Sequence, residues 1–126
     1  MGRRSIDVPG LGHGNPIPNA SVVGNLLVTG GVSGQDPVSG QIPDDPAVEV
    51  AQAFANLRAI LDAAGASLDA VAKVTVFVQD RAFRKHVNPV WTELFPDPES
   101  RPARHTLETS LSGVRIQLEC LAVVDG

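Results

Sequence analysis

The sequence predicts an α+β fold in which two helices cover one face of a mixed sheet, in the order β-β-α-β-α-β-β. Three observations predict this class. A two-residue hairpin signal lies within residues 21–30, apolar residues recur at helical spacing over residues 50–64, and apolar and polar residues alternate over residues 114–124.

The N-terminal part of the chain combines an arm, a hairpin and a loop. Residues 1–20 are rich in glycine, proline and asparagine, so we expect an irregular arm there. Two β-prone runs then flank a Gly-Asn pair at 24–25, which predicts a hairpin with glycine at the first turn position. A Gly-Gly pair at 30–31 ends the second strand, and the polar residues 33–45 are expected to form a loop.

The clearest helix signal begins at Asp45, which can cap the first turn, with Pro46 at the first helical position. Its apolar stripe consists of Val50, Ala53, Phe54, Leu57, Ile60, Leu61 and Ala64. Gly65 is a natural C-terminal stop, so one long helix is expected to pack on the sheet.

A strand and a second helix are predicted next. In the strand, over residues 71–79, one face carries Ala72, Val74, Val76 and Val78, and the other carries Lys73, Thr75, Phe77 and Gln79. Asp80 caps the helical stretch, whose stripe consists of Phe83, Val87, Val90, Trp91 and Leu94. Pro89 leaves two alternatives: it interrupts and kinks one helix, or Asn88 caps a new helix with Pro89 in its first turn.

Two strands finish the chain, over residues 103–108 and 114–124. The core face of the last strand carries Val114, Ile116, Leu118, Cys120, Ala122 and Val124. The face away from the helices is expected to carry Lys73, Thr75, Phe77, Arg115, Gln117, Glu119, Leu121 and Val123. A half-apolar open face predicts packing against other copies of the chain, with the polar residues lining a gap.

Composition limits the class of protein. The chain has 126 residues, of which 43% are hydrophobic and 19% charged, and this predicts one folded domain over residues 1–126. The net charge of −4 argues against a nucleic-acid partner. The single cysteine favours a reducing, cytoplasmic location, and no apolar run is long enough to predict a membrane span. His13, His86 and His105 are dispersed, so no metal site is expected.

Two charged residues near the C-terminus are candidates for chemistry. Arg104 offers a guanidinium fork that suits a carboxylate, with a surface salt bridge as the alternative interpretation. Glu119 lies on the polar face of the last strand and could act as a general acid or base, with a solvated or paired charge as the alternative. Cys120 points to the apolar face and is expected to be an inert core thiol.

Taken together, six segments resemble the reactive-intermediate (enamine/imine) deaminases, the Rid or YjgF-type family. They are VGNLLVTGG at 23–31, NLRAILDAAGASL at 56–68, VAKVTVFV at 71–78, VNPVW at 87–91, RPARHT at 101–106 and QLECLAV at 117–123. The resemblance covers nearly the whole chain. It implies a chorismate-mutase-like fold assembled as a homotrimeric barrel, with clefts between subunits.

The same resemblance implies an activity and a set of site residues. The activity is the hydrolysis of 2-aminoacrylate-like imino acids to keto acids and ammonia, without metal or cofactor. Arg104 matches the arginine that binds the substrate carboxylate, and Glu119 matches the glutamate near the attacking water. Gly31 and Asn88 match positions at the cleft, and backbone amides between Arg104 and Thr106 are expected to assist binding.

The chain also departs from the family pattern. Where typical members read Gly-Pro-Tyr-Ser-Gln, this chain has Asn-Pro-Ile-Pro-Asn at 15–19, so Ile17 replaces the tyrosine that usually closes the cleft. Thr29 stands near the position of the usual serine, and Thr106 stands where many members have cysteine. We therefore expect a divergent member with a more apolar pocket and a bulkier imine as its substrate.

Two other functions remain as alternatives. The first is a non-catalytic protein that binds a small carboxylate or acts as an accessory, which the replacement at Ile17 motivates. The second is an endoribonuclease or translation inhibitor, a label also attached to this family. The acidic balance and the absence of an aromatic stacking face count against it.

Overall fold

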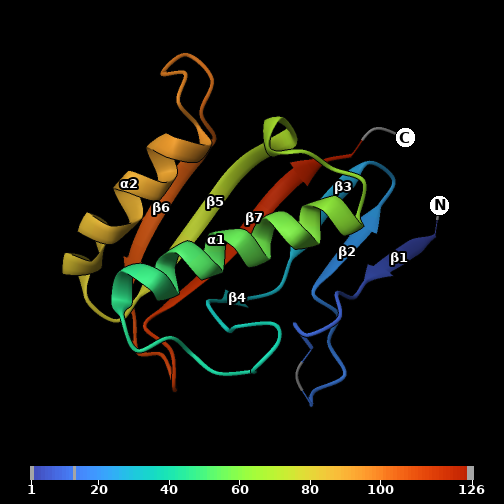
Figure 1. Ribbon diagram of the computed structural model, residues 1–126. Helices are drawn as coiled ribbons and strands as arrows, with labels where there is room; N and C mark the ends of the chain where they lie inside the picture. The colour runs from blue at the N-terminus through green and yellow to red at the C-terminus, as the bar shows by residue number, and fades with distance from the viewer. Residues whose placement is uncertain (1, 13, 125–126) are drawn as a thin grey trace.

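Two helices lie on one face of a mixed sheet, as predicted (Figure 1). The computed structural model describes residues 2–12 and 14–124. The strands are β1 (Arg3–Ile6), β2 (Ala20–Val23), β3 (Leu26–Thr29), β4 (Val32–Ser33), β5 (Val71–Val78), β6 (Ala103–Glu108) and β7 (Ile116–Val123). The helices are α1 (Pro46–Ala63) and α2 (Arg84–Leu94), with short 3₁₀ turns η1 (Leu68–Ala70) and η2 (Arg81–Phe83).

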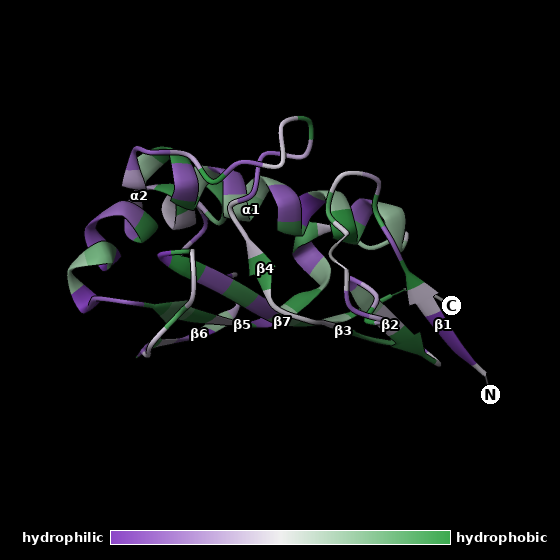
Figure 2. Cartoon of the chain, turned by 90° about the horizontal axis from the view of Figure 1, so that it is seen from below, coloured by the Kyte–Doolittle hydropathy of each residue, from purple (hydrophilic) through white to green (hydrophobic). Residues whose placement is uncertain are grey.

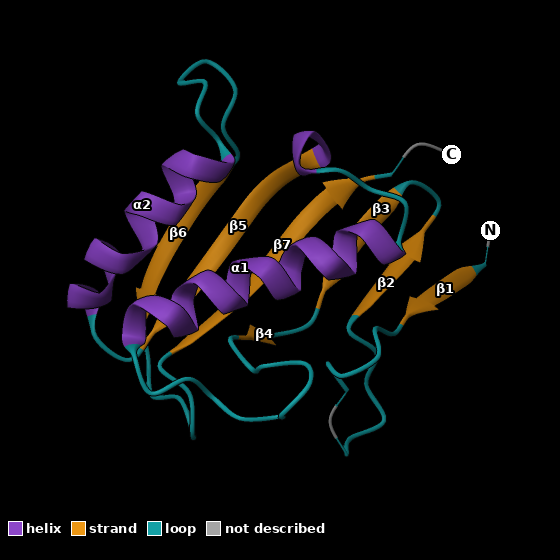
Figure 3. Cartoon of the chain, in the orientation of Figure 1, coloured by secondary structure: helices purple, strands orange, loops and turns teal. Residues whose placement is uncertain are grey.

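The sheet is ordered β1-β2-β3-β7-β5-β6, and β4 pairs with β7 as well (Figure 3). Among the strands of the described residues, only β5 and β6 pair in parallel. The last strand in the sequence, β7, therefore lies between the hairpin strand β3 on one side and β5 on the other. It joins the N-terminal and C-terminal parts of the sheet.

The predicted hairpin is confirmed. Val23 pairs with Leu26 across the two-residue turn, and Gly24 has a φ of 61°, a left-handed conformation that favours glycine. The prediction that residues 1–20 form no regular element is wrong, because β1 pairs with β2 at the edge of the sheet. Of its residues only Ile6 is buried, so the strand depends on backbone pairing and leaves no periodic apolar signal in the sequence.

The predicted start of α1 is confirmed. The Asp45 carboxylate accepts a hydrogen bond from the Ala47 amide at 2.8 Å, and Pro46 is the first helical residue. After α1 ends at Ala63, Gly65 has a φ of 77°. The cap and the stop therefore set the length of the helix, and its apolar stripe is buried against the sheet.

The second helix resolves the two alternatives at Pro89. α2 runs unbroken from Arg84 to Leu94 with Pro89 inside it, so Asn88 does not start a new helix. Asp80 caps the 3₁₀ turn η2 that leads into it, and its carboxylate accepts from the Ala82 amide. Asn88 consequently lies within a helix face, where its side chain is free to contact the neighbouring strand.

The face assignment of β5 is wrong at one residue. The pairing of β5 with β7 shifts register between Val71 and Lys73, a β-bulge that turns Ala72 outward and puts Val71 in the core instead. Val74, Val76 and Val78 are fully buried, as predicted. The alternation predicted for the last strand is confirmed along the whole of β7.

The helices and the sheet form two layers, and none of the described elements covers the second face of the sheet (Figure 2). Its exposed apolar residues are Val23, Leu26, Val28, Leu107, Leu121 and Val123. Arg115 was predicted on this face and is not there: it precedes β7 and bonds the Glu49 carboxylate of α1. The open face is thus more apolar than the sequence suggested. No helix within residues 2–12 and 14–124 has the length and apolar character needed to cross a membrane.

Candidate functional site

Arg104 lies on the edge strand β6, beside α2. Its register partner on β5 is Val74, a fully buried residue, so the Arg104 side chain is on the helix-covered face. There its Nη2 donates a hydrogen bond to the Asn88 Oδ1 at 2.8 Å, and its Cζ lies 4.9 Å from the centre of the Trp91 ring. An amide and an aromatic face therefore hold the guanidinium at the edge of the sheet.

The sequence of α2 explains this contact. Asn88 and Trp91 are three residues apart and so share one helix face. Trp91 is fixed in turn by Phe95, with ring centres 4.9 Å apart, and by Phe54 of α1 at 6.4 Å in an edge-to-face arrangement. The Arg104 cation thus rests on a buried aromatic cluster whose orientation is set by the core.

The charge of Arg104 has no counter-ion in the described part of the chain. The ion pair that forms among the described residues joins Glu49 to Arg115 and does not involve Arg104. The Nη1 of Arg104 is shielded from solvent and finds no hydrogen-bond acceptor among residues 2–12 and 14–124. Burial, and then the nearby Arg84 cation, lower the pKa of Arg104, although a guanidinium stays protonated at neutral pH. This site therefore favours an anion from outside the chain, and the alternative of a surface salt bridge at Arg104 has no support.

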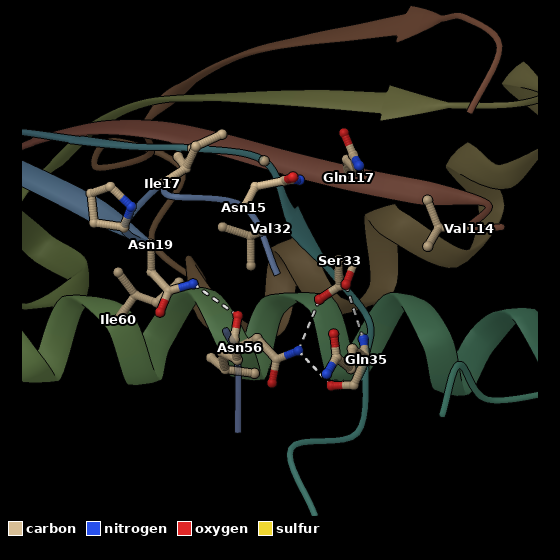
Figure 4. Close-up of a pocket in the computed structure, with 14 residues that line it drawn as sticks. Asn15, Ile17, Asn19, Val32, Ser33, Gln35, Asn56, Ile60, Val114 and Gln117 are labelled. Atoms are coloured by element: carbon tan, nitrogen blue, oxygen red, sulfur yellow. Dashed lines mark hydrogen bonds between the residues drawn. The ribbon is translucent and has the colours of Figure 1, made fainter. Parts of the chain in front are cut away.

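A pocket of about 410 Å³ lies between the N-terminal arm, the β3–β4 link, α1 and β7 (Figure 4). Its lining residues are Leu11, Asn15, Ile17, Pro18, Asn19, Gly30, Gly31, Val32, Ser33, Gln35, Asn56, Ile60, Val114 and Gln117. Two predicted site residues, Ile17 and Gly31, are among them. Ile17 is 57% exposed, so it stands at the mouth of the pocket.

Amide side chains hold the walls of this pocket in place. The buried Asn56 donates through Nδ2 to the carbonyls of Ser33 and Gln35, both at 2.8 Å, which fixes the loop after β4 on α1. Asn19 accepts from the Val8 amide and donates to the Leu11 carbonyl, which folds the arm back on itself. The pocket is therefore pre-formed by hydrogen bonds within the chain.

Gln117 is the polar residue of β7 that lines the pocket. A Cβ added to Gly31 would lie 3.0 Å from the Gln117 Oε1, so a side chain at position 31 would force this amide to move. In Figure 4 the Gln117 side chain points away from α1, toward the open side of the sheet. Glycine at position 31 lets the backbone and the amide approach each other at the pocket edge.

Glu119 lies one step further along β7, on the open face. It pairs with Thr75 of β5, whereas Arg104 pairs with Val74. Successive residues of a strand face opposite ways, so Glu119 and Arg104 are on opposite faces of the sheet. Their strands are not neighbours either, because β5 lies between β6 and β7. One chain therefore does not bring these two groups to one ligand.

The predicted site residues thus fall into three places. Arg104, Asn88 and Thr106 lie together at the β6–α2 edge, where Thr106 pairs with Val76 and shares the face of Arg104. Ile17 and Gly31 line the pocket. Glu119 lies on β7, on the open face of the sheet.

Sequence reasoning assigned no site role to two residues that contact these places, Trp91 and Gln117. Trp91 has the spacing of a core aromatic on α2, and Gln117 looks like an ordinary polar residue of a half-exposed strand. The three-residue spacing between Asn88 and Trp91 was the available signal for the first. The resemblance placed Ile17 and Gly31 at a cleft, whereas Gln117 was expected only among the polar residues of the open face.

The free thiol of the chain is placed away from this chemistry. Cys120 is buried in the core, and burial, with a contribution from Glu119, raises the pKa of its thiol to about 12. Within the described residues, no three His, Cys, Asp or Glu side chains gather closely enough to hold a metal ion. His86 and His105 are among these residues, and His13 lies outside them.

The model of the family described as Endoribonuclease L-PSP matches residues 15–124. The chain belongs to this family. An Escherichia coli (strain K12) protein named 2-iminobutanoate/2-iminopropanoate deaminase is 33% identical over 104 residues, which cover 80% of this chain and 81% of that protein. A RutC family protein of Pyrococcus abyssi is 37% identical over 110 residues and is matched over 85% of both chains.

Solved structures of the family have the same fold. The crystal structure of the Escherichia coli YjgF gene product superposes with a TM-score of 0.85 at 29% identity, covering 95% of this chain and 98% of that one. RidA from an Antarctic Psychrobacter superposes with a TM-score of 0.87 at 25% identity, covering 96% and 99%. The YjgF-type fold expected from the sequence is confirmed.

Proposed function

We propose that this protein hydrolyses 2-imino acids and their enamine tautomers to 2-keto acids and ammonia. The observation that carries the proposal is the Arg104 guanidinium, which is held by Asn88 and Trp91 and has no carboxylate partner in the described chain. A substrate carboxylate is the anion that such a fork binds well. The deaminase named above, which is 33% identical to this chain, supports the same reaction class.

The proposed reaction needs an anchor and a proton carrier. Arg104 holds the carboxylate, and backbone amides near Thr106 add donors. A water, oriented by Glu119, adds to the iminium carbon and passes a proton to the Glu119 carboxylate. Glu119 returns this proton to the nitrogen. The carbon–nitrogen bond then breaks and ammonia leaves, while the hydroxyl gives its proton to Glu119 and the keto group forms. Proton transfer of this kind contributes about 10²- to 10⁴-fold to the rate.

A site of this kind requires two copies of the chain. Arg104 and Glu119 face opposite sides of one sheet, so the carboxylate anchor of one copy has to meet the Glu119 of another. The exposed apolar residues of the open face, such as Leu26, Leu121 and Val123, supply a surface that self-association would bury. We propose the homotrimer with its clefts between subunits as the active form.

A mixing experiment tests both the residues and the two-copy site. Arg104→Ala and Glu119→Gln are each expected to be inactive as pure proteins. Co-expressed with different tags and purified as mixed oligomers, they should regain activity, because some clefts then combine an intact Arg104 with an intact Glu119. In a randomly mixed cyclic oligomer about a quarter of the clefts are of this kind, so about a quarter of the wild-type rate is expected.

The controls separate the possible failures. Pure Arg104→Ala should keep the oligomeric state of the wild type by sedimentation, so that its inactivity reflects the anchor. A mixed oligomer without activity would contradict a site shared between two copies. Either Arg104 and Glu119 would then act within one chain, or neither would belong to the site. Undiminished imine hydrolysis by pure Arg104→Ala would remove Arg104 as the anchor.

The same preparations test the alternatives. A carboxylate-binding protein without catalysis would bind 2-keto acids through Arg104 and leave the rate of ammonia release from imines unchanged. The family description makes an endoribonuclease the other candidate. RNA cleavage that persists in Arg104→Ala after further purification would favour that function over ours.

A further inference from the structure

Thr75 differs from the other buried polar residues of the described chain. The side chains of Glu49, Asn56 and Thr29 each form a hydrogen bond within the fold. The Thr75 side chain is 7% exposed, and its hydroxyl has no partner among residues 2–12 and 14–124. Buried polar groups in folded proteins are paired in the great majority of cases, so this hydroxyl calls for an explanation outside the packing of the chain.

Thr75 lies in the middle of a row of three polar residues across the open face of the sheet. Its register partner on β7 is Glu119, and its register partner on β6 is His105. The three strands are successive members of the sheet, with β5 in the centre (Figure 3). Partners in register point to the same face, and neighbouring strands are about 4.8 Å apart. Adjacent members of the row are therefore within reach of each other, directly or through one water.

His105 is the member of the row that meets solvent. It is exposed and lies on the edge strand β6, whereas Glu119 is half-buried on β7. The exposed apolar residues of β2 and β3 lie on the other side of β7 from His105. An interface built on those residues consequently does not require His105 to be covered.

The proposed reaction leaves a proton on Glu119 at the end of each turnover. The added water gives up two protons in succession. Glu119 passes the first to the nitrogen and holds the second when the keto group forms. A protonated carboxyl cannot accept a proton from the next water, so continued turnover needs a path that takes this proton from Glu119 to solvent.

We infer that Thr75 and His105 form this path. The inference rests on the proposed function and adds two proton-carrying residues to it. A hydroxyl both accepts and donates, so the Thr75 oxygen takes the proton of the Glu119 carboxyl while its own proton passes to a neutral nitrogen of His105. One O–H bond is exchanged for another at Thr75, an N–H bond forms at His105, and the imidazolium releases the proton to water.

The other side chains beside the row on the open face do not offer such a path. Lys73 lies two residues before Thr75 and on the same face, opposite Leu121. An ammonium has three donors and no acceptor, so it cannot take up the proton. Phe77, two residues after Thr75, does not titrate. Among the described neighbours of Thr75 on this face, His105 is thus the group suited to carry the proton onward.

The test measures how turnover depends on buffer. Imines are generated in situ by an amino-acid oxidase, and the hydrolysis that occurs without the protein is subtracted at each buffer concentration. In dilute buffer, His105→Ala should lower kcat about 100-fold, the lower end of what a positioned proton carrier contributes. It should leave kcat/KM nearly unchanged, because the keto acid forms before Glu119 loses its proton. Added imidazole should restore kcat, and wild type should not respond to it.

A pair of substitutions tests the hydroxyl. Thr75→Val removes it at nearly the same side-chain volume and should show the same loss of kcat without loss of kcat/KM. Thr75→Ser keeps the hydroxyl and should retain most of the wild-type kcat. Equal kcat values for the valine and serine variants would remove Thr75 from the path.

His86→Ala is the matched control. His86 lies on α2 beside the Phe83 ring, with ring centres 6.1 Å apart, and is not part of the row. This variant should keep the wild-type kcat in dilute buffer and should not respond to imidazole. A loss of kcat in both histidine variants would refute a specific role for His105.

The outcomes separate this inference from the proposed function. If wild type hydrolyses imines and His105→Ala keeps its kcat in dilute buffer, ammonia or bulk water removes the proton. The path is then refuted although the deaminase function stands. If His105→Ala lowers kcat and kcat/KM equally and imidazole restores neither, His105 acts on binding or folding and the path is also refuted. If wild type hydrolyses no imine, the proposed function fails, and the path fails with it.

Discussion

Two arginines at the ends of strands show opposite ways of placing a charge. Arg115, just before β7, bonds the carboxylate of Glu49, whose side chain is fully buried, and donates through Nη2 to the Pro43 carbonyl. Arg104, on β6, contacts the amide of Asn88 and the ring of Trp91, and has no carboxylate partner in the described chain.

The difference separates a structural charge from one that is available for function. The charge of Arg115 is neutralised inside the fold, where it fastens the start of α1 to the segment leading into β7. The charge of Arg104 is oriented but not neutralised by any residue that the structure describes, and these residues offer its Nη1 no acceptor. A buried donor without a partner costs free energy, and a bound anion nearby offsets such a cost. The contrast predicts different effects for the same substitution.

The largest effect is expected on stability at Arg115. Arg115→Met leaves the Glu49 carboxylate buried without its counter-ion, which should lower the free energy of unfolding by about 3–5 kcal/mol. Urea unfolding at pH 7 measures it. Arg104→Met is the control, with an expected loss of about 1 kcal/mol or less from the missing contact with Trp91. Equal losses of unfolding free energy in the two variants would contradict the distinction between a structural charge at Arg115 and an available charge at Arg104.

A smaller effect, on activity rather than stability, is expected from Arg104→Lys. Lysine keeps the charge but loses the planar fork and its stacking on the ring. Loss of one charge-assisted hydrogen bond, about 1.5–3 kcal/mol, corresponds to a fall of about 10- to 100-fold in kcat/KM for imine hydrolysis. A lysine variant as active as wild type would mean that a point charge is sufficient and that the fork has no role.

Trp91 should have a more modest influence on the same anchor. Trp91→Leu removes the aromatic face under the guanidinium, worth about 0.5–2 kcal/mol, so the Kd for a 2-keto acid should rise about 2- to 30-fold. Trp91→Phe keeps an aromatic face and should recover part of that loss. Both variants also disturb the core, so their unfolding free energies are measured alongside. Equal Kd values for the two, at similar stability, would refute a role for the ring.

The smallest effect concerns a group that burial keeps neutral, Cys120. With its pKa raised to about 12, the thiol should not react with a disulfide reagent at pH 8 until the protein is unfolded in urea. The pKa of the thiol is raised on folding. Its contribution to the free energy of unfolding is therefore fully present below the unfolded pKa, near 9, and is lost as the pH rises toward 12. Rapid labelling of native protein at pH 8 would contradict the burial.

The sequence was informative where local signals decide the structure. Asp45, Pro46 and Gly65 mark the ends of α1, and the alternation of β7 identifies its buried face. Arg104 was a candidate because of its guanidinium fork and the family resemblance, and the structure places it against Asn88 and Trp91. These elements are set by caps, turns and periodicity that lie within a few residues of one another.

Other features depend on contacts that the sequence does not display. β1 exists because β2 offers it a backbone partner, and Ala72 faces outward because a bulge interrupts the β5–β7 register. Arg115 leaves the open face because Glu49, far away in the sequence, binds it. The separation of Arg104 from Glu119 follows from strand order, which no local pattern contains.

The position of β7 also has a consequence for how the chain folds. The N-terminal strands and the β5–β6 pair touch one another in the sheet only through this strand, which comes after all of them in the sequence. Its pairings with β3 and β5 close long stretches of chain, and loop closure of that kind slows the search for the native state. We therefore expect the rate-limiting step of folding to be the insertion of β7 between two preformed halves.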